Sequence, residues 1–327
     1  MSRSNLDIVK VADAFPYPAD SPTDQLQKLG SYFHFRIATH PGVTLGYVPP
    51  SIALTFAGLP DWALNPDCSP RTLTLVGGHD EPTRTAMLEK TTSGMRATGH
   101  FKNLEKWRDE LFPVYGPEEE LLFSIERSAT PLFGVVTYGV HMTAYRMSPG
   151  KDGQDSMEIW VPRRSSNRAK FPGMLDTSVG GGLATGETPW TCLIRESEEE
   201  ASLREEVVKR AEDAGALTYF YLSGEGSGGE AGLAQPECSY VFDLDLSGSP
   251  PDTLVPNDGS VEAFALMTVA EIKRALSNGE FKPNCALVML DFLIRHGQIK
   301  AEHEPDYEEI CSRLHRNLEF PVPRMFG

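Results

Sequence analysis

Short apolar stretches separated by turn signals mark the first third of the chain. Residues 35–56 alternate strand-like apolar runs with Pro-Gly and Pro-Pro breaks, and residues 71–76 alternate apolar and polar positions as a strand does. Apolar positions in 83–98 and 102–111 recur at helical spacing. The pattern predicts a small α+β unit, in which we find no chemical motif.

A second and larger unit interleaves strand and helix patterns. Strand patterns cover 132–145, 157–161, 216–222, 238–244 and 261–267, and helix patterns cover 268–277, 283–296 and 305–316. Strands alternating with helices predict an α/β layer architecture. We place the N-terminal α+β domain at 1–125, the second domain at 126–300, and a C-terminal helix and tail at 301–327.

Charge restricts the partners that this fold can have. The chain has 327 residues with 46 Asp and Glu against 30 Lys and Arg, a formal net charge of −16. An acidic excess of this size repels phosphate backbones and anionic lipid, so we expect neither nucleic acid nor membrane as a partner. The net charge does not exclude a small anionic substrate, because a local basic pocket or a metal ion overrides the global electrostatic field.

Cysteine usage and targeting signals bear on the compartment. The five cysteines stand far apart without a CxxC pair, which predicts neither a disulfide framework nor a zinc site. The first residues lack the apolar segment of a signal peptide, and no apolar run approaches the ~20 residues that span a bilayer. We therefore expect a cytoplasmic protein, and the sequence leaves a homodimer open.

A glycine turn followed by an acidic helix carries the chemistry. Thr188 before Pro189 predicts a capped helix start with proline in the first turn. One face of this helix is apolar or small and should pack inward; it comprises Trp190, Leu193, Ile194, Ser197 and Ala201. Another face gathers three carboxylates at i,i+3 and i,i+4 spacing: Glu196, Glu199 and Glu200.

This clustering of carboxylates requires a compensating charge. Each like-charge pair costs about 0.2–0.5 kcal/mol on an exposed helix, and the helix dipole disfavours anions near the C-terminus. A divalent cation converts the repulsion into coordination, and hard oxygen ligands suit Mg²⁺ or Mn²⁺. A solvated acidic helix is the plainer interpretation, but Glu187 and Arg195 at fixed offsets from the glycine turn favour a metal site.

These residues resemble the Nudix box, which is written G-x5-E-x7-R-E-U-x-E-E-x-G-U with U apolar. The match runs through Gly181, Glu187, Arg195, Glu196, Glu199, Glu200 and Leu203. Ser197 stands in an apolar slot, and Ser202 replaces the second glycine. The second departure tests whether the helix ends at a positive φ, which serine adopts poorly. Neither departure removes a carboxylate.

Segments on both sides of the box extend the similarity. They are Glu126–Ala129, Leu132–Gly134, Gly139–His141, Trp160–Arg164, Lys170–Asp176, Gly180–Gly182, Asp258–Glu262 and Phe281–Cys285. Together they resemble a Nudix subfamily, mainly of fungi and plants, that carries an N-terminal domain of unknown function. Its relatives include the Nudix half of fungal thiamine pyrophosphokinase fusions. This chain ends soon after the Nudix unit, so we expect the kinase half to be missing.

The resemblance implies a Nudix α/β/α sandwich behind a smaller N-terminal α+β domain. The implied reaction is Mg²⁺-dependent attack of water on a diphosphate, for which the metal lowers the pKa of bound water. The implied substrate is thiamine diphosphate or its damaged oxo and oxy analogues, cleaved to the monophosphate and phosphate. The implied metal ligands are Glu196, Glu199, Glu200 and, through water, Glu187.

Other residues of the motif receive supporting or open roles. Arg195 is expected to orient a neighbouring glutamate, and Gly181 and Gly182 to permit close approach of the backbone. Two residues are candidates for the general base. One is Glu199 in the box, and the other is Glu262, which starts a strand pattern after a glycine turn.

Basic residues next to the box predict a diphosphate clamp. Arg163, Arg164 and Lys170 form a compact basic cluster, and Arg binds phosphate bidentately; pairing with surface carboxylates is the alternative. Asp176 is a candidate for holding an amino or pyrimidine group of the substrate. The alternative, with equal weight, is that its side chain caps a turn. His141 lies in an apolar strand pattern, so we expect this histidine to have a structural role.

Two other functions compete with this hypothesis. A Nudix enzyme of the same fold could act on nucleoside diphosphate derivatives or isoprenoid diphosphates, although isoprenoid isomerases need a cysteine that we cannot place here. A non-catalytic diphosphate-binding module is the alternative from another class. Such a module would be expected to lose glutamates of the box, and this chain keeps all of them.

Overall fold

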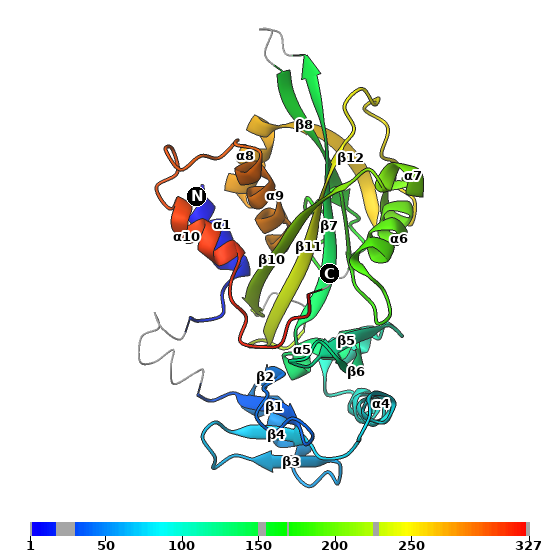
Figure 1. The fold of residues 1–327 in the computed structure, drawn as a ribbon, viewed down its shortest axis with the longest axis vertical. Coiled ribbons are helices and arrows are strands. Elements are labelled where there is room, and N and C mark those ends of the chain that lie inside the picture. Colours follow the sequence, from blue (N-terminus) through cyan, green and yellow to red (C-terminus); the bar gives the residue numbers. More distant parts are fainter. Residues whose placement is uncertain (1, 18–29, 150–154, 169, 225–228, 325–327) are drawn as a thin grey trace.

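The structure is a computed structural model that describes residues 2–17, 30–149, 155–168, 170–224 and 229–324. Figure 1 shows an elongated molecule, with a small sheet at one end and a larger sheet flanked by helices through the rest. No described helix is long and apolar enough to cross a membrane.

The larger sheet has the strand order β10-β11-β7-β8-β12, with β9 paired to β7. The strands are β7 (Thr137–Pro149), β8 (Asp155–Arg164), β9 (Val179–Gly182), β10 (Glu212–Leu222), β11 (Ala234–Asp245) and β12 (Val261–Thr268). Only β7 and β11 pair in parallel; the other neighbours in this sheet are antiparallel.

Helices cover both faces of this sheet. Because side chains alternate along a strand, Ile159 of β8 joins the core beneath one helical layer while Trp160 joins the core beneath the other. The first layer contains α8 (Val269–Asn278), α9 (Pro283–Arg295) and α10 (Tyr307–Leu314), and the second contains α6 (Pro189–Ala201) and α7 (Glu205–Val208). The predicted α/β/α sandwich is confirmed.

The N-terminal helix α1 (Asn5–Ala12) belongs to the first of these layers. Its Leu6, Ile8 and Val9 are buried in the same core as α9 and α10. Figure 1 shows α1 beside α10, far from the small sheet. The chain therefore begins on the larger sheet before it enters the N-terminal unit.

The N-terminal unit comprises β1 to β6 with their helices. Its four-stranded sheet has the order β2-β1-β4-β3, and β5 and β6 form a separate hairpin. The elements are β1 (Phe33–Ile37), β2 (Gly46–Val48), α3 (Pro50–Ala53), η1 (Leu54–Phe56), β3 (Trp62–Asn65), β4 (Thr72–Leu75), α4 (Glu81–Ala97), η2 (Lys102–Lys106), β5 (Leu111–Tyr115) and β6 (Leu121–Glu126). The predicted α+β character is present, with the short η3 (Arg127–Ala129) and α5 (Thr130–Phe133) leading into β7.

Two predicted elements differ from the structure. The helix expected at 102–111 is a 3₁₀ turn over Lys102–Lys106, and the chain turns at Asp109, with φ of 55°, into the β5–β6 hairpin. The strand expected from 132 begins at Thr137, because the preceding residues form α5. In the first place, Leu111 pairs within the β5–β6 hairpin and does not continue a helix. In the second, a short helix with proline in its first turn ends at Gly134, which has a left-handed conformation.

The N-terminal unit packs directly against the larger sheet. Tyr47 stacks on Phe15 and Phe220, with ring centroids 5.8 and 6.3 Å away. The backbone of Thr185, just before α6, donates to the Leu111 carbonyl at 2.8 Å. The Tyr47 contacts join β2 to the larger sheet, and the Thr185 hydrogen bond holds the β5–β6 hairpin next to the start of the acidic helix.

Candidate active site

The acidic helix α6 forms where the sequence predicts it. The Thr188 side chain accepts from the Thr191 backbone at 3.2 Å, and Pro189 occupies the first turn. Leu193, Ser197 and Ala201 are buried against the sheet. Glu196 and Glu200 lie on the adjoining face toward β9, and Glu199 is exposed. At the other end, Ser202 adopts φ of 54° and ψ of 27°, the left-handed conformation that the glycine of the box would supply.

Glycines of β9 bring its backbone against this helix. A Cβ on Gly181 would lie 2.0 Å from the carboxylate of Glu196, so only glycine leaves room for that side chain. A Cβ on Gly182 would meet the Phe112 ring at 2.5 Å. Gly180 donates its N–H to Glu200 Oε2 at 3.0 Å. The strand therefore binds Glu200 through a backbone N–H and leaves room for Glu196 beside Gly181.

Arg195 is the centre of an ion-pair network on the exposed side of α6. Its Nε and Nη2 donate to the two oxygens of Glu187 at 2.7 and 3.1 Å. Its Nη1 reaches Glu196 Oε1 at 2.8 Å and Glu199 Oε2 at 3.2 Å. Glu187 also accepts from the Ala184 backbone at 3.0 Å. Burial raises the pKa of Glu187, but these hydrogen bonds outweigh it and the pKa is lowered.

Glu200 and Glu196 form a second, poorly compensated pair. Burial, reinforced by the charges of Asp176 and Glu196, raises the pKa of Glu200 to about 8. Burial also raises the pKa of Glu196, although Arg195 opposes the shift. Besides Gly180, Glu200 meets Ser260 Oγ at 3.4 Å and Arg168 Nη2 at 3.5 Å, both long contacts. Glu199, by contrast, is half exposed, and its partner is Arg195.

The chemistry of this donor set fits a divalent cation. Two carboxylates whose raised pKa values disfavour their charged form lie together with a third exposed one, and they supply hard oxygen donors. A bound cation would restore the charged form. Glu187 fits less well as a ligand, because both of its oxygens already accept hydrogen bonds from Arg195.

A cavity of about 360 Å³ opens beside β9 and is strongly cationic. Its lining includes the Gly180–Gly182 backbone and eight basic side chains: Lys102, Lys106, Arg108, Arg127, Arg164, Arg168, Lys170 and Lys282. Among the lining residues, all of them described, Glu237 is the one acidic side chain. A cationic cavity in a protein of net charge −16 suits a small anionic ligand.

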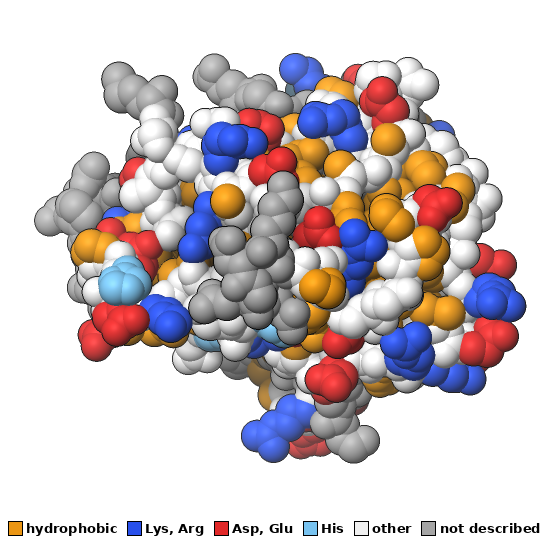
Figure 2. All heavy atoms as spheres, turned by 90° about the horizontal axis from the view of Figure 1, so that it is seen from above, with side chains coloured by type: hydrophobic (Ala, Val, Ile, Leu, Met, Phe, Trp, Pro, Cys, Tyr) orange, Lys and Arg blue, Asp and Glu red, His pale blue; other side chains and the backbone are white. Residues whose placement is uncertain are grey.

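The end of the molecule away from the N-terminal unit is charged differently. Figure 2 shows the end of the molecule away from the N-terminal unit, where the described basic and acidic side chains are interspersed. The concentration of positive charge around the cavity is therefore a local feature.

The residues predicted to clamp the diphosphate divide between two environments. Arg164 and Lys170 line the cavity, whereas Arg163 lies outside the lining set and donates to the Gly173 carbonyl at 2.7 Å. Arg164 is already engaged, donating to Asp176 Oδ2 at 2.5 Å and to the carbonyl oxygens of Phe171 and Lys170. Within the described part of the chain, the Lys170 ammonium has no ion pair or hydrogen bond, in contrast to the Arg164 guanidinium. Desolvation by the cavity walls and then the nearby cations, first Arg127, lower its pKa.

The remaining predicted residues are also located. Glu262 is exposed at the irregularity in the pairing of β12 with β8, two residues beyond Ser260. Asp176 accepts from Arg164, from the Thr177 backbone and from the Cys285 thiol. Burial raises the pKa of Asp176, but the charges of Lys282 and Arg164 outweigh it, so the pKa lies below its ordinary value.

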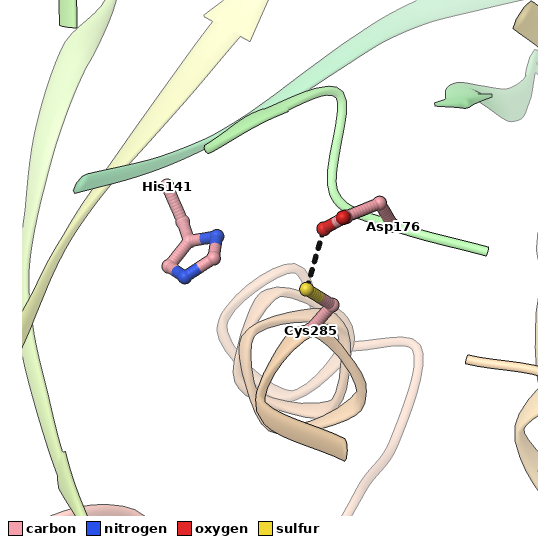
Figure 3. Close-up of side chains that lie close together, drawn as sticks. All are labelled: His141, Asp176 and Cys285. Atoms are coloured by element: carbon pink, nitrogen blue, oxygen red, sulfur yellow. Dashed lines mark hydrogen bonds between the residues drawn. The ribbon is translucent and has the colours of Figure 1, made fainter. Parts of the chain in front are cut away.

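His141, Asp176 and Cys285 lie close together, as Figure 3 shows, with ligand-type atoms within 4.8 Å of one another. His141 meets Thr177 Oγ1 at 2.8 Å, and burial lowers its pKa to about 4, so the ring is neutral. Burial raises the pKa of the Cys285 thiol, which donates to Asp176 at 2.5 Å. Because Arg164 already pairs with Asp176 and Lys282 adds a second positive charge, we assign this cluster to packing and charge pairing.

Sequence reasoning missed several residues of the cavity. Arg168 reaches Glu200, and its Nε is buried without a hydrogen-bond partner among the described atoms. Arg127 and Lys282 were inside segments that resemble the subfamily, Glu126–Ala129 and Phe281–Cys285, and that resemblance was the available signal. No spacing rule singled out these basic residues.

Two family models match the chain. Residues 147–285 match the NUDIX domain. Residues 26–137 match a domain of unknown function, DUF4743. The first match contains the box and the second contains the whole N-terminal unit described above.

Relatives agree with these matches. The uncharacterized protein YJR142W of Saccharomyces cerevisiae is 37% identical over 250 residues, which are 74% of this chain and 68% of the yeast protein. Nudix hydrolase 20, chloroplastic, of Arabidopsis thaliana is 36% identical over 211 residues, 63% of this chain and 52% of the plant protein. A solved Ap4A hydrolase of C. elegans aligns over 50% of this chain and 99% of its own length, with 17% identity and a TM-score of 0.34.

The chain belongs to the Nudix hydrolase family and carries an N-terminal DUF4743 domain. It is therefore an enzyme of the pyrophosphohydrolase class. The chain spans about half to two thirds of the length of these curated relatives.

Proposed function

We propose that this protein cleaves the diphosphate of a small organic substrate, with thiamine diphosphate or its oxo and oxy analogues as the first candidates. One observation carries the proposal: a cluster of three carboxylates on α6, two of them largely buried, lies beside a cationic cavity of small-molecule size. Carboxylates that attract a divalent cation and basic groups that attract phosphate are the two halves of a metal-dependent phosphoanhydride site.

We assign the roles on α6 from the contacts. Glu196, Glu199 and Glu200 would hold Mg²⁺, or Mn²⁺, which when bound offsets phosphoryl charge and lowers the pKa of water. Gly180 orients Glu200 through its N–H. Arg195 orients Glu196 and Glu199, and Glu187 acts through Arg195 as a positioning residue.

Two residues are candidates for the general base. Glu199 is half exposed and can accept a proton from water without moving out of a buried pair. Glu262 is exposed on β12, close in sequence to Ser260, which touches Glu200. We favour Glu199, because it lies on the same helical face as the other carboxylates.

The phosphate side of the site is supplied by Lys170, Arg168 and Arg127, which line the cavity next to the glycine backbone. Arg164 supports the wall by holding the carbonyl oxygens of the 170–171 turn, and Asp176 fixes Arg164. Arg163 lies outside the lining set, so we expect it to contribute less to substrate binding.

Other residues of the cavity lining support an organic group with positive or amino character. They are Tyr219, Tyr221 and Asn284, together with Glu237, the one acidic side chain among the lining residues. Aromatic rings offer faces and edges to a heteroaromatic ring, and a carboxylate favours an amino group or a cationic ring. This pairing supports thiamine-type substrates over neutral or purely anionic ones.

The test is phosphate release with Mg²⁺ from thiamine diphosphate, its oxo and oxy analogues, ADP-ribose, NADH and nucleoside triphosphates. We expect the thiamine compounds to have the highest kcat/KM. The variant Glu200→Gln should lose at least ~100-fold in kcat, as expected for removing a main electrostatic group. Glu198→Gln is the matched control, because Glu198 is exposed on the same helix outside the carboxylate face.

The outcomes separate the claims. A preference for ADP-ribose, NADH or a nucleoside triphosphate would keep the hydrolase and reject the thiamine assignment in favour of nucleoside diphosphate derivatives. Wild-type rates in Glu200→Gln would reject the catalytic site. A cytoplasmic location stays a prediction, as does a homodimer.

A further inference from the structure

We propose that the N-terminal unit forms one wall of the substrate site, and that Lys102, Lys106 and Arg108 bind a phosphate group of the substrate. The diphosphate class of the ligand rests on the function proposed above. The inference gives a role in substrate binding to a domain that carries no chemical motif.

The geometry of the cavity is the first argument. Lys102, Lys106 and Arg108 lie on η2 and the segment that follows it, and all three line the same cavity as the Gly180–Gly182 backbone. Phe112 of β5 also lines this cavity, and its ring fills the space above Gly182. The N-terminal unit therefore reaches the glycine strand that holds Glu200.

Nearby carboxylates are bound to the backbone of this segment. Glu230, from the region between β10 and β11, accepts from the N–H groups of Lys102 and Asn103 at 2.5 and 3.2 Å. Glu126 accepts from the N–H of Arg108 at 3.0 Å. Glu230 anchors η2 to the larger sheet, and Glu126 of β6 holds the segment after η2 within the N-terminal unit. Both carboxylates accept from backbone donors. The cationic ends of the side chains stay available.

The charge arrangement is the second argument. Among the described residues, no ion pair within 4.0 Å joins Lys102, Lys106 or Arg108 to a carboxylate, whereas Arg164 and Arg168 each have one. The positive charges of Lys106 and Arg108 contribute to lowering the pKa of Lys170, after desolvation and the charges of Arg127 and Lys282. Cations from both units therefore act on one space, and their repulsion is relieved when an anion binds there.

The size of the cavity selects the kind of anion. A volume of about 360 Å³ lies at the lower end of the range for small-molecule sites, roughly 300–1,000 Å³. A nucleic-acid backbone would meet the acidic exterior of a protein with net charge −16. A small phosphorylated compound meets both conditions.

Binding of inorganic diphosphate in the presence of Mg²⁺, measured by calorimetry at about 100 mM salt, tests the proposal without requiring turnover. The full-length triple variant Lys102→Gln, Lys106→Gln, Arg108→Gln should raise Kd at least about tenfold, because each lost contact is a charge-assisted hydrogen bond. Each single exchange should raise Kd at least about twofold, so the test stands even if the triple variant folds poorly.

A matched triple variant controls for net charge. This control variant carries Lys90→Gln, Lys209→Gln and Lys300→Gln. It also removes three positive charges, but from exposed lysines outside the cavity lining. Its Kd should stay within about twofold of the wild type, since separated surface charges are screened.

Equal Kd values for the two triple variants, or unchanged values in all single variants, would overturn the inference. Failure of the wild type to hydrolyse any diphosphate would reject the proposed function. A selective loss of diphosphate binding in the cavity variant would, even then, support the inference that the N-terminal unit forms one wall of the binding site. If hydrolysis occurs, the cavity variant should raise KM for the substrate more than it lowers kcat.

Discussion

Two serines in α6 show how single residues adapt the box to this chain. Ser202 occupies the left-handed position at the helix end, and Ser197 fills a slot that is usually apolar. The hydroxyl of Ser197 is buried without a hydrogen-bond partner among the described residues. Both departures are visible in the sequence. In the structure, one is a strained backbone position and the other an unpaired buried hydroxyl, and neither removes a carboxylate of the box.

Ser202→Gly should stabilise the protein by about 0.5–1 kcal/mol. The left-handed conformation destabilises a residue with a Cβ by roughly 1–2 kcal/mol, and glycine removes this strain. Glycine also increases the conformational entropy of the unfolded chain, which offsets part of the stabilisation. Urea unfolding of wild type and variant measures the difference. A lower midpoint for Ser202→Gly would contradict the strained conformation, and Ser202→Val should be less stable than wild type.

At the residue scale, the sequence predicted the carboxylates but only part of the cavity. The glutamates of α6 share one helix, so their spacing alone places them together. Arg127, Arg168 and Lys282 come from three separate segments, and only the folded chain joins them. The residues Lys102, Lys106 and Arg108 lie in a stretch that helical spacing misassigned, which hid their orientation.

The elements are joined by buried charge pairs as well as by the apolar cores. Asp243 of β11 accepts hydrogen bonds from Arg295 and His296 at the end of α9. Arg295 also pairs with Asp291 at 2.7 Å within α9. This network fixes the C-terminal end of α9 to the sheet on the face opposite α6. Its residues were not predicted, because ion pairs between elements leave no periodic signal.

The Asp243 network predicts a pH-dependent stability. Burial raises the pKa of Asp243, but the hydrogen bonds of His296 and Arg295 outweigh it, so the folded pKa lies below the ordinary value. A depressed carboxyl pKa stabilises the fold above the unfolded pKa of about 4, and that contribution is lost as the pH falls through the folded pKa.

Asp243→Asn should therefore be less stable than wild type at neutral pH by about 1–3 kcal/mol, because Arg295 loses a charged partner. The difference should narrow as the pH falls below about 4, where the wild-type carboxyl takes up its proton. Urea unfolding at a series of pH values measures this. A constant difference from pH 7 to about 3 would contradict the assignment.

At the scale of the whole molecule, the site lies where two units meet. The α/β/α sandwich supplies the carboxylates and most of the basic residues, and the N-terminal unit supplies further basic residues across the cavity. Apolar periodicity predicted the α+β unit and the α/β layers, since it reports local structure, and the resemblance to the Nudix family implied the sandwich. It could not predict their docking, which depends on tertiary contacts such as those of Tyr47 and Glu230.

We expect the glutamates of α6 to share one divalent cation. Calorimetric titration of Mn²⁺ into wild type, Glu200→Gln and the control Glu198→Gln tests this shared site. We expect the wild type and Glu198→Gln to bind Mn²⁺ with the same Kd, and Glu200→Gln to bind at least about tenfold more weakly, because it lacks a hard anionic ligand. Equal Mn²⁺ affinity in Glu200→Gln and wild type would contradict the account.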